Sequence, residues 1–149
     1  MASLKQIENF LSSGPIAIAG VSRNPRKFGQ MAFRELKEKG LNVIPVNPSA
    51  EEIMGIKAYP DIRSLPVNVG GVIILTNKEQ TASVVRDAKE KGIRNIWIQQ
   101  SADTPEAIKE LEGSDINYVT GECILMHYKP HSFHKFHRAL NKLFGRYPK

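Results

Sequence analysis

The chain has little of two things that mark secreted and membrane proteins. It contains a single cysteine, Cys123, so it cannot form an internal disulfide. It has no apolar run near the roughly 20 residues that span a bilayer, and residues 1–8 lack the apolar core of a signal peptide. These absences argue against a disulfide-stapled scaffold and predict a cytoplasmic location, where thiols stay reduced.

Acidic residues are absent from one part of the chain. Residues 123–149 hold six Lys or Arg and no Asp or Glu, whereas residues 1–122 hold 15 residues of each sign. The net charge of +6 therefore belongs to the C-terminal segment. Because the charges balance over the rest of the chain, we expect no nucleic-acid partner.

The chain does contain a short apolar strand that runs into a polar turn and then a helix. Residues 16–20 are continuously apolar, which is typical of a strand buried on both faces. Residues 20–29 are rich in Gly, Ser, Pro and basic residues, and Phe28, Ala32 and Leu36 follow at helical spacing. Such a turn directs backbone N–H groups and the positive end of a helix dipole at one point, which favours phosphate.

Strand and helix patterns alternate along the rest of the chain. A capping box (Ser3, Gln6) begins a helix before the first strand. Further strands are predicted at 42–46, 71–75, 95–99 and 116–119, with helices at 77–92 and 104–111. The pattern predicts a Rossmann-like α/β fold: a three-layer, doubly wound, mostly parallel five-stranded sheet with helices on both faces. We expect one domain over residues 1–149, with its core at about 14–123 and a helical extension at about 127–149.

Two local features of this sheet are also predicted. Pro45 lacks an N–H group, so its strand should lie near an edge of the sheet, or Pro45 near a strand end. Residues 49–66 have no clear periodicity and are expected to be irregular, with a short helical turn near Asp61–Ser64.

The turn lacks the signatures of two common nucleotide sites. Residues 20–25 (Gly-Val-Ser-Arg-Asn-Pro) form neither the Gly-x-Gly-x-x-Gly of a dinucleotide site nor the Gly-Lys-Ser/Thr of a P-loop. Asn47 follows the second strand, where an NAD site has an acid for the ribose. An NAD(P)-binding regulator is therefore disfavoured but stays an alternative. Arg23, Arg26 and Lys27 are either solvated loop charges or suit a ligand with several phosphates.

Four motifs stand in this order: Gly20-x-Ser22-x-x-Pro25-x-Lys27-Phe28-Gly29, Pro45-Val46-Asn47-Pro48, Gly55-x-x-x-Tyr59-x-x-Ile62-x-x-Leu65-Pro66 and Trp97-Ile98-Gln99. Together they resemble the small stand-alone CoA-binding proteins, a family similar in fold to the CoA-binding domain at the start of the succinyl-CoA ligase alpha subunit. The resemblance runs from about residue 14 to Cys123. It implies a Rossmann-like site for coenzyme A or an acyl-CoA.

The resemblance also implies which residues meet each part of the ligand. Phosphates and ribose would be met by Gly20, Val21, Ser22 and Lys27, and the adenosine would be flanked by Val46, Asn47 and Pro48. The pantetheine would pass Thr76, Asn77 and Gln99, and the candidate set is completed by Arg23, Pro25, Phe28 and Gly29. The chain departs from the family at Val69-Gly70-Gly71, where an acid is usual, and at Gln100-Ser101-Ala102, where a glycine is usual. The second departure adds side chains beside the pantetheine path and bears on the ligand's pose or affinity.

The sequence gives no clear catalytic site. It has no nucleophile elbow with a Ser/His/Asp order and no strongly signalled pair of carboxylates. Cys123 could form a mixed disulfide with CoA or accept an acyl group, but a small buried residue at a strand end is the role we favour. We therefore expect a binding protein and no enzyme. The alternative is a component of a CoA-dependent ligase or acyltransferase that a partner chain completes.

The C-terminal segment offers two further hypotheses. His127, His131, His134 and His137 have spacing that would suit zinc on a helix, but the segment supplies no acid to complete a ligand set, and we expect no metal. Residues 131–144 carry an apolar stripe and a basic stripe at helical spacing. This helix would cover the sheet, or it would contact a second subunit, an acidic partner or a membrane surface.

Overall fold

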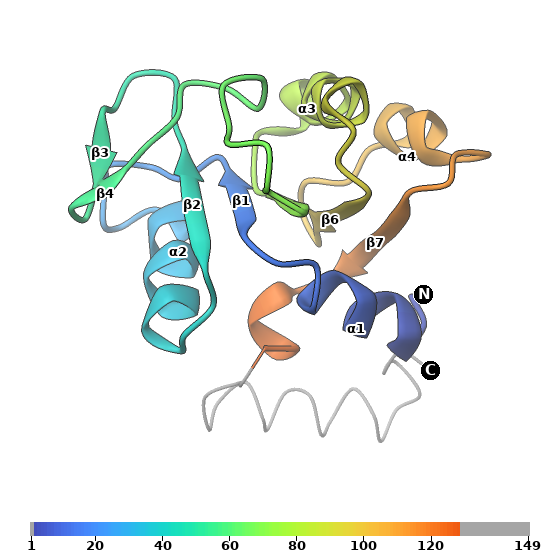
Figure 1. The fold of residues 1–149 in the computed structure, drawn as a ribbon, viewed down its shortest axis with the longest axis horizontal. Helices are drawn as coiled ribbons and strands as arrows, with labels where there is room; N and C mark the ends of the chain where they lie inside the picture. The colour runs from blue at the N-terminus through green and yellow to red at the C-terminus, as the bar shows by residue number, and fades with distance from the viewer. Residues whose placement is uncertain (1, 129–149) are drawn as a thin grey trace.

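The structure, a computed structural model, describes residues 2–128 and contains a five-stranded parallel sheet with helices on both faces (Figure 1). The strand order is β2-β1-β5-β6-β7. The strands are β1 (Ile16–Ala19), β2 (Val43–Val46), β5 (Gly71–Ile74), β6 (Asn95–Gln99) and β7 (Asn117–Glu122). The helices are α1 (Leu4–Leu11), α2 (Phe28–Glu38), α3 (Lys78–Lys91) and α4 (Pro105–Leu111), followed by the 3₁₀ turn η1 (Ile124–Met126). The predicted Rossmann-like fold is confirmed.

Two predictions fall beyond this part of the chain. The C-terminal helix at 131–144 and the histidines at 131, 134 and 137 lie outside the described residues.

No helix within residues 2–128 combines the length and the apolar character that crossing a membrane requires.

The central strands are buried on both faces, as their continuous apolar character predicts. Ile16 and Ile18 pack with α1, α2 and η1, whereas Ala17 and Ala19 pack with α3 and α4. The same alternation continues through β5 and β6, where Trp97 faces the α1 side. The sheet therefore divides two hydrophobic cores, and each helix contributes one apolar stripe to one of them.

The edge position predicted for the strand of Pro45 is confirmed, because Pro45 lies in β2 and β2 is an edge strand of the sheet. The chain beyond it is more regular than predicted. Residues 52–57 form a two-stranded hairpin, β3 (Glu52–Ile53) and β4 (Ile56–Lys57), and Tyr59 then pairs with Val46. Asp61–Ser64 forms a turn, in which the Asp61 carboxylate accepts a hydrogen bond from the Ser64 N–H (2.9 Å), and not the expected turn of helix.

The last strand is also longer than predicted. β7 ends at Glu122, whereas the apolar pattern ends at Val119. A register shift between Trp97 and Gln99 lets Glu122 pair with Gln99, and Gly121 adopts a positive φ of 74° beside it. The pairing of β7 with β6 therefore continues past Val119 with an altered register.

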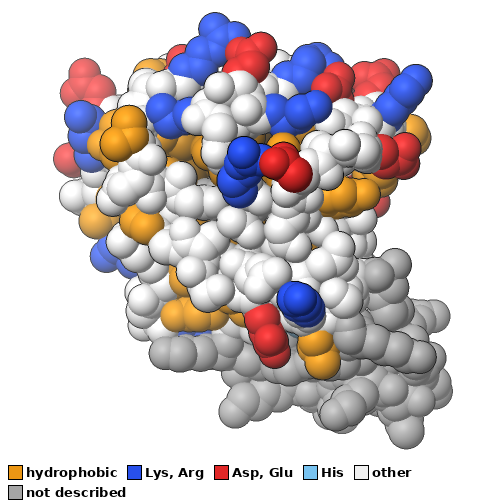
Figure 2. Space-filling model, turned by 45° about the vertical axis from the view of Figure 1, so that its right-hand side comes forward, with side chains coloured by type: hydrophobic (Ala, Val, Ile, Leu, Met, Phe, Trp, Pro, Cys, Tyr) orange, Lys and Arg blue, Asp and Glu red, His pale blue; other side chains and the backbone are white. Residues whose placement is uncertain are grey.

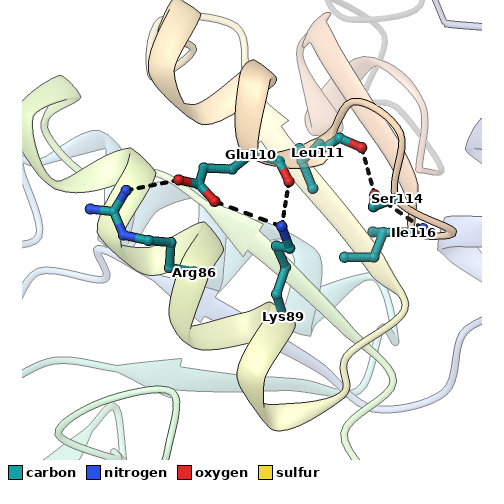
Figure 3. Close-up of polar contacts among 6 residues, drawn as sticks. All are labelled: Arg86, Lys89, Glu110, Leu111, Ser114 and Ile116. Carbon is teal, nitrogen blue, oxygen red and sulfur yellow. Dashed lines mark hydrogen bonds and ion pairs between the residues drawn. The ribbon is translucent and has the colours of Figure 1, made fainter.

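Polar contacts join α3 to α4 on one face of the sheet (Figure 3). Glu110 accepts a hydrogen bond from Arg86 Nη1 (3.1 Å), and its backbone carbonyl accepts one from Lys89 Nζ (2.6 Å). Ser114 then bridges Leu111 and Ile116 at the start of β7. Figure 2 shows basic and acidic side chains interspersed over the α3 end of the molecule. These contacts fix the α3–α4 pair without creating a surface of one charge sign.

We expect Met54→Asn to stabilise the protein by about 0.5–1 kcal/mol. Met54 and Gly55 form the tip of the β3–β4 hairpin with φ of 54° and 76°. Two positive φ values define the turn that favours Asn-Gly, and an ordinary side chain is strained there. Urea denaturation measures the change. Met54→Ala removes the same side chain but keeps the strain, so an equal gain from Ala would contradict this explanation.

Candidate functional site

The turn after β1 is built on close contact between backbone segments. A Cβ at Gly29 would collide with the carbonyl oxygen of Gly20, and one at Gly20 would lie 2.8 Å from the carbonyl carbon of Leu75. Gly20 also has a φ of +98°, which an L side chain rarely adopts. The two glycines therefore let the start of α2 and the loop after β5 approach the end of β1.

Polar side chains hold the turn itself in shape. Ser22 Oγ accepts a hydrogen bond from the Asn24 N–H (3.0 Å), and Asn24 Oδ1 accepts one from the Arg26 N–H (2.9 Å). The buried Gln30 side chain donates from Nε2 to the Ser22 carbonyl (3.1 Å). The predicted site residues Ser22 and Pro25 thus belong to an ordered turn that presents its exposed surface to solvent.

The N-terminus of α2 is open. Lys27 stands at the N-cap position and makes no side-chain capping bond. Within residues 2–128, no group accepts a hydrogen bond from the backbone N–H of Phe28, Gly29 or Gln30. Such unpaired N–H groups, together with the helix dipole, attract anions.

Three exposed cations surround this helix end. They are Arg23, Arg26 and Lys27, and none of them pairs with a carboxylate of the described residues. Cations beside free backbone N–H groups favour the binding of a phosphate group. Phe28, 41% exposed, adds an apolar surface next to them.

Asn47 joins the turn to the end of β2. Its Nδ2 donates to the Val21 carbonyl (2.8 Å), and its Oδ1 accepts from the Ser49 and Ala50 N–H groups (2.8 and 2.9 Å). An Asp in this place would set a carboxylate oxygen against the Val21 carbonyl. The geometry therefore gives a structural reason for Asn, in addition to the absence of an acid for an NAD ribose.

A cleft of about 320 Å³ opens at the carboxyl ends of β1, β2 and β5, on the α3 side of the sheet. It lies where the strand order turns back between β1 and β5, the usual ligand position in such sheets. Of the predicted site residues, the structure places these around the cleft: Gly20, Val46, Pro48 and Thr76. Because Gly20 also contacts the start of α2, one elongated ligand can reach both the cleft and the cationic turn.

Besides Ala19 at the end of β1, the rest of the cleft is formed by residues that the sequence did not predict as site residues. They come from the loop after Tyr59 and from α3: Pro60, Asp61, Ile62, Glu79, Gln80, Ser83, Val84 and Asp87. On α3 the positions 80, 83, 84 and 87 have helical spacing beside the buried stripe of the helix. That spacing is the available sequence signal, but a solvated helix face has the same spacing, so it does not identify these residues as a site.

Other predicted site residues lie away from the cleft. Asn77 is the exposed N-cap residue of α3 and makes no side-chain capping bond. Gln99 is buried at the end of β6, where its Nε2 donates to Cys123 Sγ (3.0 Å) and its Oε1 accepts from the Ile124 N–H (3.1 Å). Gln99 thus holds the half-buried Cys123 and the start of η1 against the sheet.

The neighbouring Glu122 and His127 form a half-buried pair beside Trp97. His127 Nε2 lies 3.6 Å from Glu122 Oε1, and the rings of Trp97 and His127 are 5.7 Å apart. Burial raises the pKa of the Glu122 carboxyl. Within the described residues, no three His, Cys, Asp or Glu side chains gather as metal ligands.

The chain forms a parallel sheet with a turn after β1 that suits an anion and a cleft at the β1/β5 junction. These features define a Rossmann-like α/β binding domain. The family model for the CoA binding domain matches residues 15–129. The chain belongs to this family.

The chain is similar in sequence to proteins of two kinds, a long ligase subunit and a small protein. The chain is 34% identical over 93 residues to the alpha subunit of an ADP-forming acetate–CoA ligase II from Pyrococcus furiosus, a match over 62% of this chain and 20% of the subunit. It is 27% identical over 123 residues to the uncharacterized protein YneT of Bacillus subtilis, covering 83% of this chain and 90% of that protein. The chain therefore matches a fifth of the ligase subunit but nearly the whole of the small protein.

Solved structures of small proteins share the fold. A conserved hypothetical protein from Pyrococcus furiosus is 35% identical with a TM-score of 0.72, and the match covers 75% of this chain and 97% of that one. A hypothetical protein from Pyrococcus horikoshii is 26% identical with a TM-score of 0.79, over 87% and 91% of the two chains.

We expect Asn47→Ala to lower the free energy of unfolding by about 1–3 kcal/mol, because it leaves the Val21 carbonyl and two N–H groups without their partner. Chemical denaturation measures the loss. Asn68→Ala is the matched control, since Asn68 is exposed and makes no side-chain hydrogen bond to a described residue. Equal effects of the two substitutions would show that the Asn47 bonds do not join the loops.

Proposed function

We propose that the protein binds coenzyme A or an acyl-CoA across the carboxyl edge of its sheet, as a stand-alone binding protein. The observation that carries this proposal is the continuity between the open N-terminus of α2 and the cleft, through Gly20. An anionic phosphate group suits the first and a nucleoside suits the second. Membership of the CoA-binding domain family supports the same ligand.

The parts of the ligand follow the charges of the site. The phosphates lie against the turn of Ser22, Arg23, Pro25 and Lys27, beside Phe28 and Gly29. The adenosine enters the cleft between Val46, Pro48 and Ile62, whose apolar side chains suit a base. The pantetheine runs past Thr76 and Asn77 toward Gln99 and Cys123.

A second candidate function is that of a ligase component. It is favoured by the match to the alpha subunit of the acetate–CoA ligase. That subunit is about five times as long as the stretch that matches this chain. A partner chain would then supply the catalytic groups. Copurification of a ligase-like subunit with this protein would support that role.

Calorimetry with CoA, acetyl-CoA, NAD, NADP and ATP tests the binding proposal. We expect heat from CoA or acetyl-CoA and weaker or no binding of the other nucleotides. Native mass spectrometry of the purified protein would add the mass of any retained ligand. No binding of either CoA species at millimolar concentration would overturn the proposal.

We expect Lys27→Ala to weaken CoA binding by about 1–2 kcal/mol, the scale of a lost charge-assisted hydrogen bond. Lys37→Ala is the control, because Lys37 is an exposed lysine in the last turn of the same helix. Calorimetry compares the two variants. An unchanged affinity in Lys27→Ala would mean that Lys27 is a solvated loop charge.

We expect acetyl-CoA to slow alkylation of Cys123 severalfold if the pantetheine reaches the end of β6. Cys123 is the only cysteine of the chain, so mass spectrometry of iodoacetamide labelling reports on it alone. Adenosine 3′,5′-bisphosphate, which lacks the pantetheine, is the control and should protect little. Equal protection by both compounds would place the pantetheine elsewhere.

A further inference from the structure

Two threonine hydroxyls, one lining the cleft and one buried behind it, lie in contact. Thr76, half-buried in the loop after β5, lines the cleft. Thr81, fully buried on α3, lies behind it, and the two Oγ1 atoms are 3.3 Å apart. Each hydroxyl carries one hydrogen, so only one of the two can donate in this contact.

The surroundings of Thr81 decide which hydroxyl donates. Thr81 Oγ1 lies 2.8 Å from the carbonyl oxygen of Ala102 and 3.4 Å from that of Asn77. A carbonyl accepts and cannot donate, so the single Thr81 hydrogen is directed to these oxygens. The contact with Thr76 is then favourable only if the Thr76 hydroxyl gives its hydrogen to Thr81 Oγ1.

We propose that Thr81 is a positioning residue that fixes the Thr76 hydroxyl as a hydrogen-bond acceptor toward the cleft. The Thr76 hydroxyl gives its only hydrogen to Thr81 Oγ1, so toward the ligand Thr76 Oγ1 offers only its lone pairs, which accept hydrogen bonds. The ligand group that meets Thr76 is therefore an N–H or O–H donor and not a phosphate oxygen.

The charges around the cleft agree with this polarity. Three carboxylates, those of Asp61, Glu79 and Asp87, line it, and no Lys or Arg of residues 2–128 does. The Asp87 carboxylate pairs with Arg63 (3.3 Å), so Asp61 and Glu79 contribute most of the negative charge. Carboxylates accept hydrogen bonds and repel phosphate. The donor in question is an amide N–H or a hydroxyl of the ligand, an inference that rests on the binding function proposed above.

A double-mutant cycle on CoA affinity tests the role of Thr81. We expect Thr76→Val and Thr81→Val each to weaken binding about three- to tenfold, the range for a neutral hydrogen bond. In the Thr76→Val background, Thr81→Val should add less than about twofold, because its effect passes through Thr76. Thr76→Ser and Thr81→Ser keep the hydroxyls and should bind like the parent protein. An equal loss from Thr81→Val in both backgrounds, or no loss at all, would overturn the proposal.

Neutron diffraction on the free, deuterium-exchanged protein tests the hydrogen positions without any substitution or ligand. We expect deuterium between Thr76 Oγ1 and Thr81 Oγ1 on the Thr76 bond, and between Thr81 Oγ1 and Ala102 O. Deuterium from Thr81 directed at Thr76 would overturn the inference. A parent protein that fails to bind CoA would instead count against the proposed ligand, while the neutron map still decides the polarity of Thr76.

Discussion

The site depends on the backbone contact of Gly20 with Gly29 on one side and with Leu75 and Thr76 on the other. Without side chains at the two glycines, the first turn of α2 packs directly against the end of β1, and the β5–α3 loop does so from the opposite face. An added Cβ at either position would separate these segments and disturb the closely packed backbone. The same contact brings the anion-attracting end of α2 and the cleft at the β1/β5 junction close to each other.

Asn47 adds a second constraint at this edge. Its hydrogen bond to the Val21 carbonyl fixes the turn relative to the end of β2, and its bonds from the Ser49 and Ala50 N–H groups hold the Asn47 side chain in place. A residue in this role need not contact a ligand to affect binding, because it holds the backbone of the turn that we propose as the binding site. The presence of Asn in place of an acid, which the sequence suggests as evidence against NAD, thus has a structural cause as well.

Most of the fold could be predicted from the sequence, because the strands are continuously apolar and helix boundaries carry caps such as Ser3 and Thr104. The β3–β4 hairpin could not, since two-residue strands have no periodicity and Met54 is an unusual residue for a tight turn.

The strand-end half of the cleft could be predicted too, because carboxyl ends of parallel strands meet at one edge. The α3 half could not, because Gln80, Ser83 and Asp87 look like an ordinary solvated helix face. Gln99 illustrates a different limit: its place in a motif says nothing of the Cys123 and Ile124 groups that its side chain contacts.

The separation of charge across the site has a consequence for selectivity. Cations that pair with no carboxylate of residues 2–128 stand on the α2 side of Gly20, whereas carboxylates border the cleft on the α3 side. A ligand made only of phosphates gains from the first region and is repelled by the second. A neutral nucleoside gains from the cleft and leaves the cations without a partner. Only a molecule that joins an anionic part to a neutral, donor-bearing part satisfies both, and an elongated nucleotide conjugate has that form. If the ligand binds as proposed, its selectivity therefore comes from the separation and opposite polarity of the two halves of the site more than from any single residue.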